Sequence, residues 1–445
     1  MSTLLSPAFY STFQDSEADM STRSLEDVPE EGPPTPSGSP SGFRPTNGSR
    51  KGSPSIRTLG QGRSTSDSSS SIRRSPSVSS STSTSTIAPG AGAVVATKEK
   101  APRTLHKVRS SPKVVHDNEV EAAPSTMLYW SKALVFGVIP TRTMRAHTVT
   151  LVDTTAWLFG GCDDKECSKD IFCFDTETMQ WCRPETIGDS PPPSRAHTAT
   201  LVDRKIVVYG GGQGSTYYDS VYVLDTVTRR WSRPSVAGPK PPPRRAHTGV
   251  LYHGKIYMFG GGNGMTALND VWTLDVSNMS KMRWEELQTS GRKPGHRGYH
   301  TANLIGNVMI VVGGSDGKDC FNDIWCLNLD TLRWSKLIVD TPHRRLSHTS
   351  TQVGSYLFII GGHDGTRYRP DLLLFNLVSL AFEPRGTLGK SPTARGYHVT
   401  LLADSRLFLF GGFNGTTPFD EVHILDLAAA AYLPQVTHFD IQLPD

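Results

Sequence analysis

Six histidines recur at regular intervals along the chain, and an imidazole can act as a metal ligand or as a general base. Each is followed thirteen positions later by a pair of glycines. The histidines are His147, His197, His247, His300, His348 and His398. A zinc ion needs its ligands within about 2 Å. Residues that are equivalent by repeat symmetry are instead spread around an axis, so we expect structural hydrogen bonds and assign no metal, cofactor or catalytic residue.

Four of the six cysteines fall in the first of these units, and thiols can bind metals or undergo redox chemistry. Zinc sites usually contain closely paired cysteines. Here Cys162 and Cys167 belong to a loop, whereas Cys173 and Cys182 lie on successive expected strands. We therefore expect ordinary buried thiols rather than a metal or redox site.

Arginines also recur, at the ends of proline-rich links between the units, and a guanidinium group can bind carboxylate or phosphate bidentately. The sequence predicts a ring of six equivalent arginines, which are Arg145, Arg195, Arg245, Arg297, Arg345 and Arg395. The same rim would carry Arg244, Arg344, Arg367 and Arg369, together with Tyr217, Tyr218, Phe321 and Tyr368. Two interpretations stay open: structural bonds to carbonyls and loop acids, or docking of an acidic or phosphorylated peptide. For docking, Arg244 and Arg344 are expected to be the accessible members of their pairs.

The elements that must position these residues follow from the repeat itself. In the second unit, short strands are expected at 195–202, 206–209 and 221–224, with Trp231 on a fourth. An Asp or Asn follows the third strand and suits a tight turn. The glycines leave space where another part of the protein packs closely against the backbone. We expect the aromatic side chain of the fourth strand, from the same or a neighbouring blade, to fill this space. Units of about 50 residues with a glycine pair predict a ring of four-stranded blades.

In each unit an Asp or Asn lies 15 positions after the first glycine, and an aromatic lies at or near 21 positions after it. This spacing strongly resembles the kelch repeat over residues 145 to about 432. This resemblance implies an all-β, six-bladed kelch propeller spanning residues 122–445. Two segments could supply the outer strand of blade six. The segment at Trp130 looks like an orphan fourth strand and is favoured, and the segment at Tyr432 is the alternative.

Residues 1–121 have a different composition, rich in Ser, Thr, Pro and Gly. Such a segment cannot bury enough apolar surface to fold, so we expect a disordered tail. Residues 43–114 carry thirteen Lys or Arg against Asp67 and Glu99. Prolines and basic residues nearby make Ser39, Ser53, Ser75, Ser77 and Ser111 candidate phosphorylation sites. Interleaved aromatics are lacking, so we expect no nucleic-acid binding.

The expected function is that of an intracellular protein-binding scaffold that docks acidic or phosphorylated segments on the propeller rim. The phrases Arg-Ala-His-Thr, Gly-Gly-Gly and Val-Leu-Asp-Thr-x-Thr-x-x-Trp resemble those of fungal cell-polarity kelch proteins and Rab-effector kelch proteins. This likeness thus implies a role in cell polarity, morphogenesis or small-GTPase signalling, in the cytoplasm or at the cell cortex. No secretory signal or apolar run of about 18 residues is seen, so no membrane span is expected.

Two alternatives remain, and the first is a metal-dependent kelch enzyme, either an oxidase or a specifier-like protein. A copper set of Tyr, His and Cys cannot be assembled here. The specifier pattern Glu-x3-Asp-x3-His is also absent. Glu166 and Asp170 match its first two positions, but Phe174 occupies the position of the histidine. The second alternative is a ubiquitin-ligase substrate adaptor, for which no BTB or F-box segment is recognisable.

Overall fold

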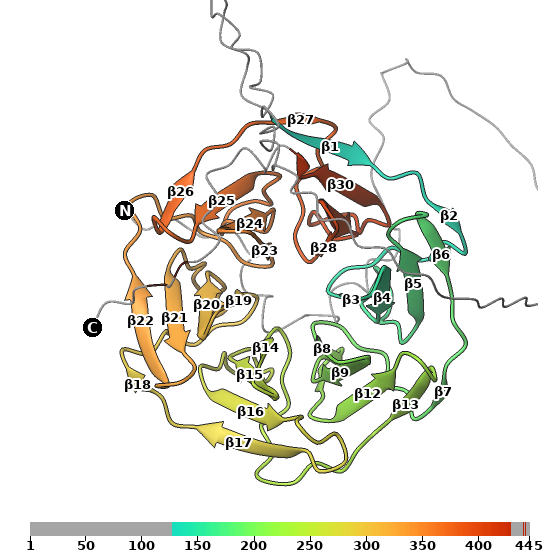
Figure 1. The fold of residues 1–445 in the computed structure, drawn as a ribbon, viewed down its shortest axis with the longest axis vertical. Coiled ribbons are helices and arrows are strands. Elements are labelled where there is room, and N and C mark those ends of the chain that lie inside the picture. The colour runs from blue at the N-terminus through green and yellow to red at the C-terminus, as the bar shows by residue number, and fades with distance from the viewer. Residues whose placement is uncertain (1–126, 429–438, 440, 442–445) are drawn as a thin grey trace, which may run out of the picture. The chain divides into compact units, whose positions relative to one another are not determined.

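A computed structural model describes residues 127–428, 439 and 441, which form a six-bladed β-propeller (Figure 1). The predicted all-β, six-bladed architecture is confirmed. The expected disorder of residues 1–121 and the five candidate phosphorylation sites fall outside the described residues, as does Tyr432. Among the described residues, no helix has the length and apolarity to cross a membrane.

Each blade has four antiparallel strands, the first of which lies nearest the axis (Figure 1). Blades one, two, four and six add a short outermost strand that pairs in parallel. Blade one contains β3 (Thr148–Val152), β4 (Thr155–Phe159), β5 (Ile171–Asp175), β6 (Gln180–Cys182) and, outermost, β2 (Phe136–Gly137). Blade two contains β8 (Thr198–Val202), β9 (Lys205–Tyr209), β12 (Val221–Asp225), β13 (Arg230–Ser232) and β7 (Ile187–Gly188). A small hairpin joins β9 to β12 and consists of β10 (Gly212–Gln213) and β11 (Thr216–Tyr217). Blade three contains β14 (Thr248–Tyr252), β15 (Lys255–Phe259), β16 (Val271–Asp275) and β17 (Arg283–Leu287).

The second half of the ring repeats this plan. Blade four contains β19 (Thr301–Ile305), β20 (Val308–Val312), β21 (Ile324–Asn328), β22 (Arg333–Leu337) and β18 (Ser290–Gly291). Blade five contains β23 (Thr349–Val353), β24 (Tyr356–Ile360), β25 (Leu372–Asn376) and β26 (Ala381–Glu383). Blade six contains β28 (Val399–Ala403), β29 (Arg406–Phe410), β30 (Val422–Asp426), β1 (Leu128–Lys132) and β27 (Thr387–Gly389). The expected strands of blade two are confirmed, although β8 begins three residues later than predicted.

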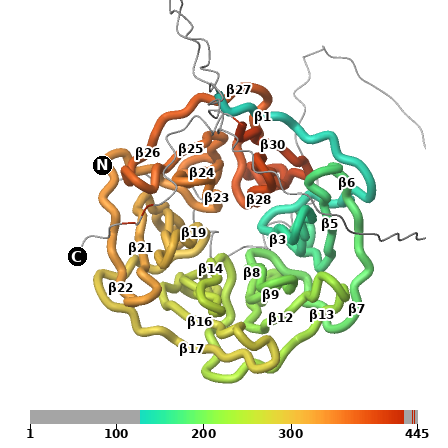
Figure 2. The backbone as a smooth tube through the Cα atoms, viewed as in Figure 1, coloured from blue at the N-terminus to red at the C-terminus, as the bar shows by residue number. Residues whose placement is uncertain are grey.

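The ring is closed by β1, as favoured from the sequence. β1 runs antiparallel to β30 and places Trp130 opposite Leu425 (Figure 2). The Trp130 side chain is 2% exposed and packs with Leu425 and Tyr356 in the hydrophobic cluster of blades five and six. The N-terminal strand β1 therefore belongs to the last blade, and the chain continues from it through β2 into the first blade.

The glycine pairs are required by close contacts, but not by those that we expected. A Cβ on Gly160 would lie 2.6 Å from the Ser194 carbonyl oxygen and 2.9 Å from the His197 ring of the next blade. Its φ of +66° is also unfavourable for other residues. The space is thus filled by the next blade's histidine and backbone. The expected filling by the fourth-strand aromatic is wrong for this position, because Trp231 packs one residue earlier, against Phe159.

The turn residues after the third strands behave as predicted. The Asp175 carboxylate accepts hydrogen bonds from the backbone N–H groups of Glu177 and Thr178, both at 2.9 Å. Asn328 makes the same pair of bonds in blade four. Each of these side chains thereby orders the tight turn that leads into the outer strand.

Candidate functional site

The predicted rim lies where the loops between second and third strands meet the links between blades. We call this side of the ring the loop face. Backbone bridges there pair Arg145 with Cys162 and Arg195 with Gly212, and so fix where each link enters its blade. In blades four to six the same bridge position is taken by Gly298, Leu346 and Gly396. The six arginines are therefore not equivalent, and the predicted single ring is corrected to two sets.

The first set is buried and consists of Arg244, Arg297, Arg345 and Arg395, each three residues before a histidine of the repeat. Arg244 is 0% exposed, and its two terminal nitrogens donate to the Asp270 carboxylate at 2.8 and 2.7 Å. It also donates to the Gly260 carbonyl at 3.0 Å. The other three make ion pairs 26 positions ahead in sequence, to Asp323, Asp371 and Glu421.

These buried pairs have a structural role. Burial acts to raise the pKa of Asp270, but hydrogen bonding and charge attraction from Arg244 outweigh it and leave that pKa below its usual value. Removing one partner of a buried pair leaves an uncompensated charge and costs about 3–5 kcal/mol. The expectation that Arg244 is the accessible member of its pair is therefore wrong, because Arg244 tethers its link to the next loop. The corresponding expectation for Arg344 holds, since Arg344 is exposed and Arg345 is buried.

The second set, Arg145, Arg195 and Arg245, belongs to three consecutive blades near the axis. The Arg145 guanidinium lies 4.1 Å above the Phe413 ring, and that of Arg245 lies 4.3 Å above Tyr217. Arg195 Nη1 lies 3.8 Å from Cys162 Sγ. Arg145 and Arg195 are half-buried, whereas Arg245 is 3% exposed. Stacking on aromatic rings holds the side chains of Arg145 and Arg245 in place.

Further out on the loop face, Arg344 and Arg367 are exposed. Arg369 lies 3.5 Å from carboxylate oxygens of Asp364 and Asp371. The predicted aromatics mostly support other groups. Tyr218 donates to the Pro193 carbonyl at 3.2 Å, Phe321 lies 4.4 Å under Arg297, and Tyr368 packs on His363 and Phe413.

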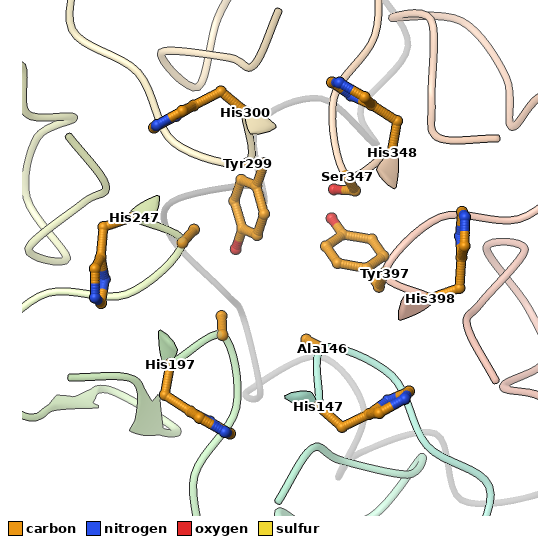
Figure 3. Close-up of a pocket in the computed structure, with 12 residues that line it drawn as sticks. Ala146, His147, His197, His247, Tyr299, His300, Ser347, His348, Tyr397 and His398 are labelled. Carbon is orange, nitrogen blue, oxygen red and sulfur yellow. The ribbon is translucent and has the colours of Figure 1, made fainter. Parts of the chain in front are cut away.

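At the centre of the loop face a small hollow opens around the axis (Figure 3). Its lining includes Ala146, Ala196 and Ala246 from one half of the ring, and Tyr299, Ser347 and Tyr397 from the other. The backbones of these six residues form a closed circle, in which each N–H donates to the carbonyl of the previous blade at 2.7–3.0 Å. The hydroxyl groups of the second half point into the hollow, which makes it chemically asymmetric (Figure 3).

The six histidines form a belt behind this circle, with their rings turned toward neighbouring blades (Figure 3). We call them the histidine belt. In five cases Nε2 lies 2.9–3.2 Å from a threonine Oγ1 of the preceding blade, as in Thr148–His197. Burial lowers the pKa of His147 to about 4 and that of His197 to about 3, so both rings stay neutral. Over the part of the chain that the structure describes, no three His, Cys, Asp or Glu side chains are grouped so as to hold a metal ion.

Several residues of this face were missed by the sequence analysis. The acids Asp270, Asp323, Asp371 and Glu421 could have been found, because each follows its arginine by the same 26 positions. The aromatics Phe413 and Phe419, which lie under Arg145 and Arg395, carry no such signal. Tyr299 and Tyr397 replace alanines of the other repeats and were visible only as departures from the pattern.

Comparison with known proteins identifies the family. The family description "KLHDC2/KLHL20/DRC7 Kelch-repeats domain" matches residues 116–261, 146–362 and 338–440. The chain therefore belongs to the kelch-repeat family.

Curated relatives match only short segments of the chain. Acyl-CoA-binding domain-containing protein 4 of Arabidopsis thaliana is 34% identical over 55 residues, which are 12% of this chain and 8% of that protein. Human host cell factor 1 is 35% identical over 78 residues, or 14% and 4% of the two chains. Rat kelch domain-containing protein 10 is 35% identical over 69 residues, or 15% and 17%. The similarity covers less than a fifth of each relative, so it identifies the repeat and not a whole-protein activity.

Proposed function

From its membership of the kelch-repeat family, we propose that this chain is a protein-binding adaptor that docks an acidic or phosphorylated segment of a partner on the loop face. The observation that carries the proposal is that the loop face has further arginines besides the four that form ion pairs with acids of the protein itself. Among the described residues, Arg145, Arg344 and Arg367 have no carboxylate within salt-bridge distance. They are placed to meet a carboxylate or phosphate that approaches from solvent.

The hollow at the axis adds to this surface. Tyr299, Ser347 and Tyr397 present hydroxyl groups (Figure 3), and Arg145 and Arg195 directly precede the lining residues Ala146 and Ala196 in the sequence. Met265, 89% exposed on the loop of blade three, adds an apolar side chain of a type enriched in interfaces. A segment with an acidic part and an apolar anchor would complement these features. We place such an adaptor in cell polarity, morphogenesis or small-GTPase signalling, in the cytoplasm or at the cell cortex, as the sequence resemblance implies.

The test uses synthetic twelve-residue peptides in three pools: Asp/Glu-rich, phosphoserine-containing and Lys-rich. Fluorescence anisotropy with the full chain is expected to show binding of one or both acidic pools and none of the basic pool. Binding should weaken as salt rises, because exposed charge pairs are screened. The double variant Arg344→Glu, Arg367→Glu should lose binding without a change in melting temperature.

The matched control is Arg229→Glu, an exposed arginine in a turn on the opposite face. It changes the net charge as each single reversal does, and should leave binding intact. Equal loss in this control would show nonspecific attraction. Absence of binding to both acidic pools by folded wild-type protein would refute the proposal.

A further inference from the structure

Two cysteines face each other across the loop of blade one. Cys162 and Cys167 are antiparallel bridge partners. The flanking hydrogen bonds run from Ser168 N–H to the Gly161 carbonyl at 2.8 Å, and from Asp163 N–H to the Glu166 carbonyl at 3.2 Å. The cysteines thus form the non-hydrogen-bonded kind of pair, in which the Cα atoms are about 4.5 Å apart and the side chains lie close. That separation falls within the range of about 4.4–6.8 Å that a disulfide spans.

The surroundings of this pair favour a thiolate at Cys162. A hydrogen bond from Cys167 is the main cause that lowers the pKa of Cys162, and the charges of Arg195 and Arg145 lower it further against the effect of burial. Both cysteines are at most 5% exposed, but Cys162 lines a cavity of about 10 Å³ beside Pro140 and Met144. A space of this size admits a molecule about as large as water.

The other cysteines serve as internal comparisons. Cys320 occupies the position of Cys167 in blade four, but it faces Ser315 and burial raises its pKa to about 12. Cys173 and Cys182 are also cross-strand partners, yet burial of Cys173 raises its pKa. Cys326 lies in the core, where burial raises its pKa to about 12. Of these thiols, Cys162 is the one that combines an opposed partner thiol with two nearby guanidinium groups.

We propose that Cys162 and Cys167 form a reversible oxidation site for hydrogen peroxide, with Cys162 as the attacking thiolate and Cys167 as the resolving thiol. The Cys162 sulfur attacks one peroxide oxygen, the O–O bond breaks, and a sulfenic acid forms while the second oxygen leaves as water after taking a proton. The Cys167 sulfur then attacks Cys162 Sγ, an S–S bond forms, and the sulfenic oxygen leaves as water with the Cys167 proton. Two thiols lose two electrons and hydrogen peroxide is reduced to two waters. The proposal does not rest on the proposed docking function, although Arg145 and Arg195 contribute to both sites.

The test treats the folded full-length protein with hydrogen peroxide, blocks free thiols with iodoacetamide and identifies the products by peptide mass spectrometry. The expected product is a Cys162–Cys167 disulfide that dithiothreitol reverses. Before oxidation, alkylation of Cys162 should be at least about tenfold faster than that of Cys320, because only the thiolate reacts and each pKa unit is tenfold. Cys162 alkylation should also change little from pH 7.5 to 9, whereas an ordinary thiol accelerates with pH.

Variants separate the steps. Cys167→Ser should stop at a Cys162 sulfenic acid that dimedone traps, and Cys162→Ser should give neither product. Cys320→Ser is the matched control and should form the disulfide as wild type does. Arg195→Gln removes one of the charges that lower the pKa of Cys162, so Cys162 alkylation should rise more between pH 7.5 and 9 than it does in the wild type. The proposal is overturned if folded protein keeps both thiols reduced, if Cys173–Cys182 is the main disulfide, or if Cys162 and Cys320 react at equal rates.

Discussion

Val399 lies in blade six at the position where the other five blades carry a threonine, and His147 of blade one therefore lacks the hydroxyl partner of the other belt histidines. Both ring nitrogens of His147 are buried, and neither has a hydrogen-bond partner among the residues that the structure describes. The gap falls at the junction of the last blade with the first. The ring is thus less well bonded near its axis at the same junction that β1 closes at the outer wall.

Val399→Thr is expected to stabilise the propeller. The new hydroxyl can bond His147 Nε2 as Thr148 bonds His197, and such a bond contributes about 0.5–1.5 kcal/mol. Urea unfolding followed by fluorescence measures the change. The reverse substitution, Thr148→Val, serves as the control and should destabilise by about 1–3 kcal/mol, because it leaves His197 unsatisfied. An unchanged or lower stability of Val399→Thr would mean that the His147 ring is already satisfied, by water for instance.

The histidine belt should make stability fall in mild acid. The pKa of His147 is lowered to about 4 and those of His197, His348 and His398 to about 3, mainly by burial. Above the unfolded pKa of about 6.5 both states are neutral and the belt adds no pH dependence. Below it, the unfolded chain binds protons that the folded chain does not. Each histidine then costs up to about 1.4 kcal/mol per pH unit until the folded pKa is reached.

Urea unfolding at pH 7.5, 6.0 and 5.0 measures this loss. His197→Gln should reduce the slope between pH 6 and 5 by about one proton, since a glutamine amide can replace the bond to Thr148 without titrating. Carboxylate titration falls largely below this window. Equal stability at pH 7.5 and 5.0 would show that the belt histidines protonate in the folded protein.

Trp130→Ala should destabilise the propeller by about 3–5 kcal/mol, the usual cost of truncating a buried tryptophan. Trp130 is 2% exposed within β1, whereas its neighbour Tyr129 is 54% exposed. Tyr129→Ala is therefore the matched control and should shift the melting temperature little. A stable Trp130→Ala variant would show that β1 is dispensable for closing the ring.

The fold could be predicted from the sequence because its determinants repeat. The histidine, the glycine pair and the turn Asp or Asn each occur in every unit at nearly fixed spacing, so the blades and the closing strand at Trp130 were recognisable. The arginines were misjudged because the repeat carries arginine at either of two adjacent positions before the histidine. At the first position, as at Arg244, the side chain is buried against an acid such as Asp270. At the second, as at Arg245, the residue forms the backbone bridge nearer the axis. The pairing of Cys162 with Cys167 depends on the path of an irregular loop, which spacing alone does not fix.

The last prediction distinguishes Arg244 from Arg344, which look alike in sequence because each precedes another arginine. Arg244→Ala should destabilise the protein by about 3–5 kcal/mol, since Asp270 would lose its buried partner. Arg344→Ala should change the free energy of unfolding by less than about 0.5 kcal/mol, because its side chain is exposed. Asp270→Asn should resemble Arg244→Ala, and the double variant should cost less than the sum of the two, because both remove one interaction. Additive effects in this cycle would mean that Arg244 and Asp270 stabilise the loop face separately rather than as a pair.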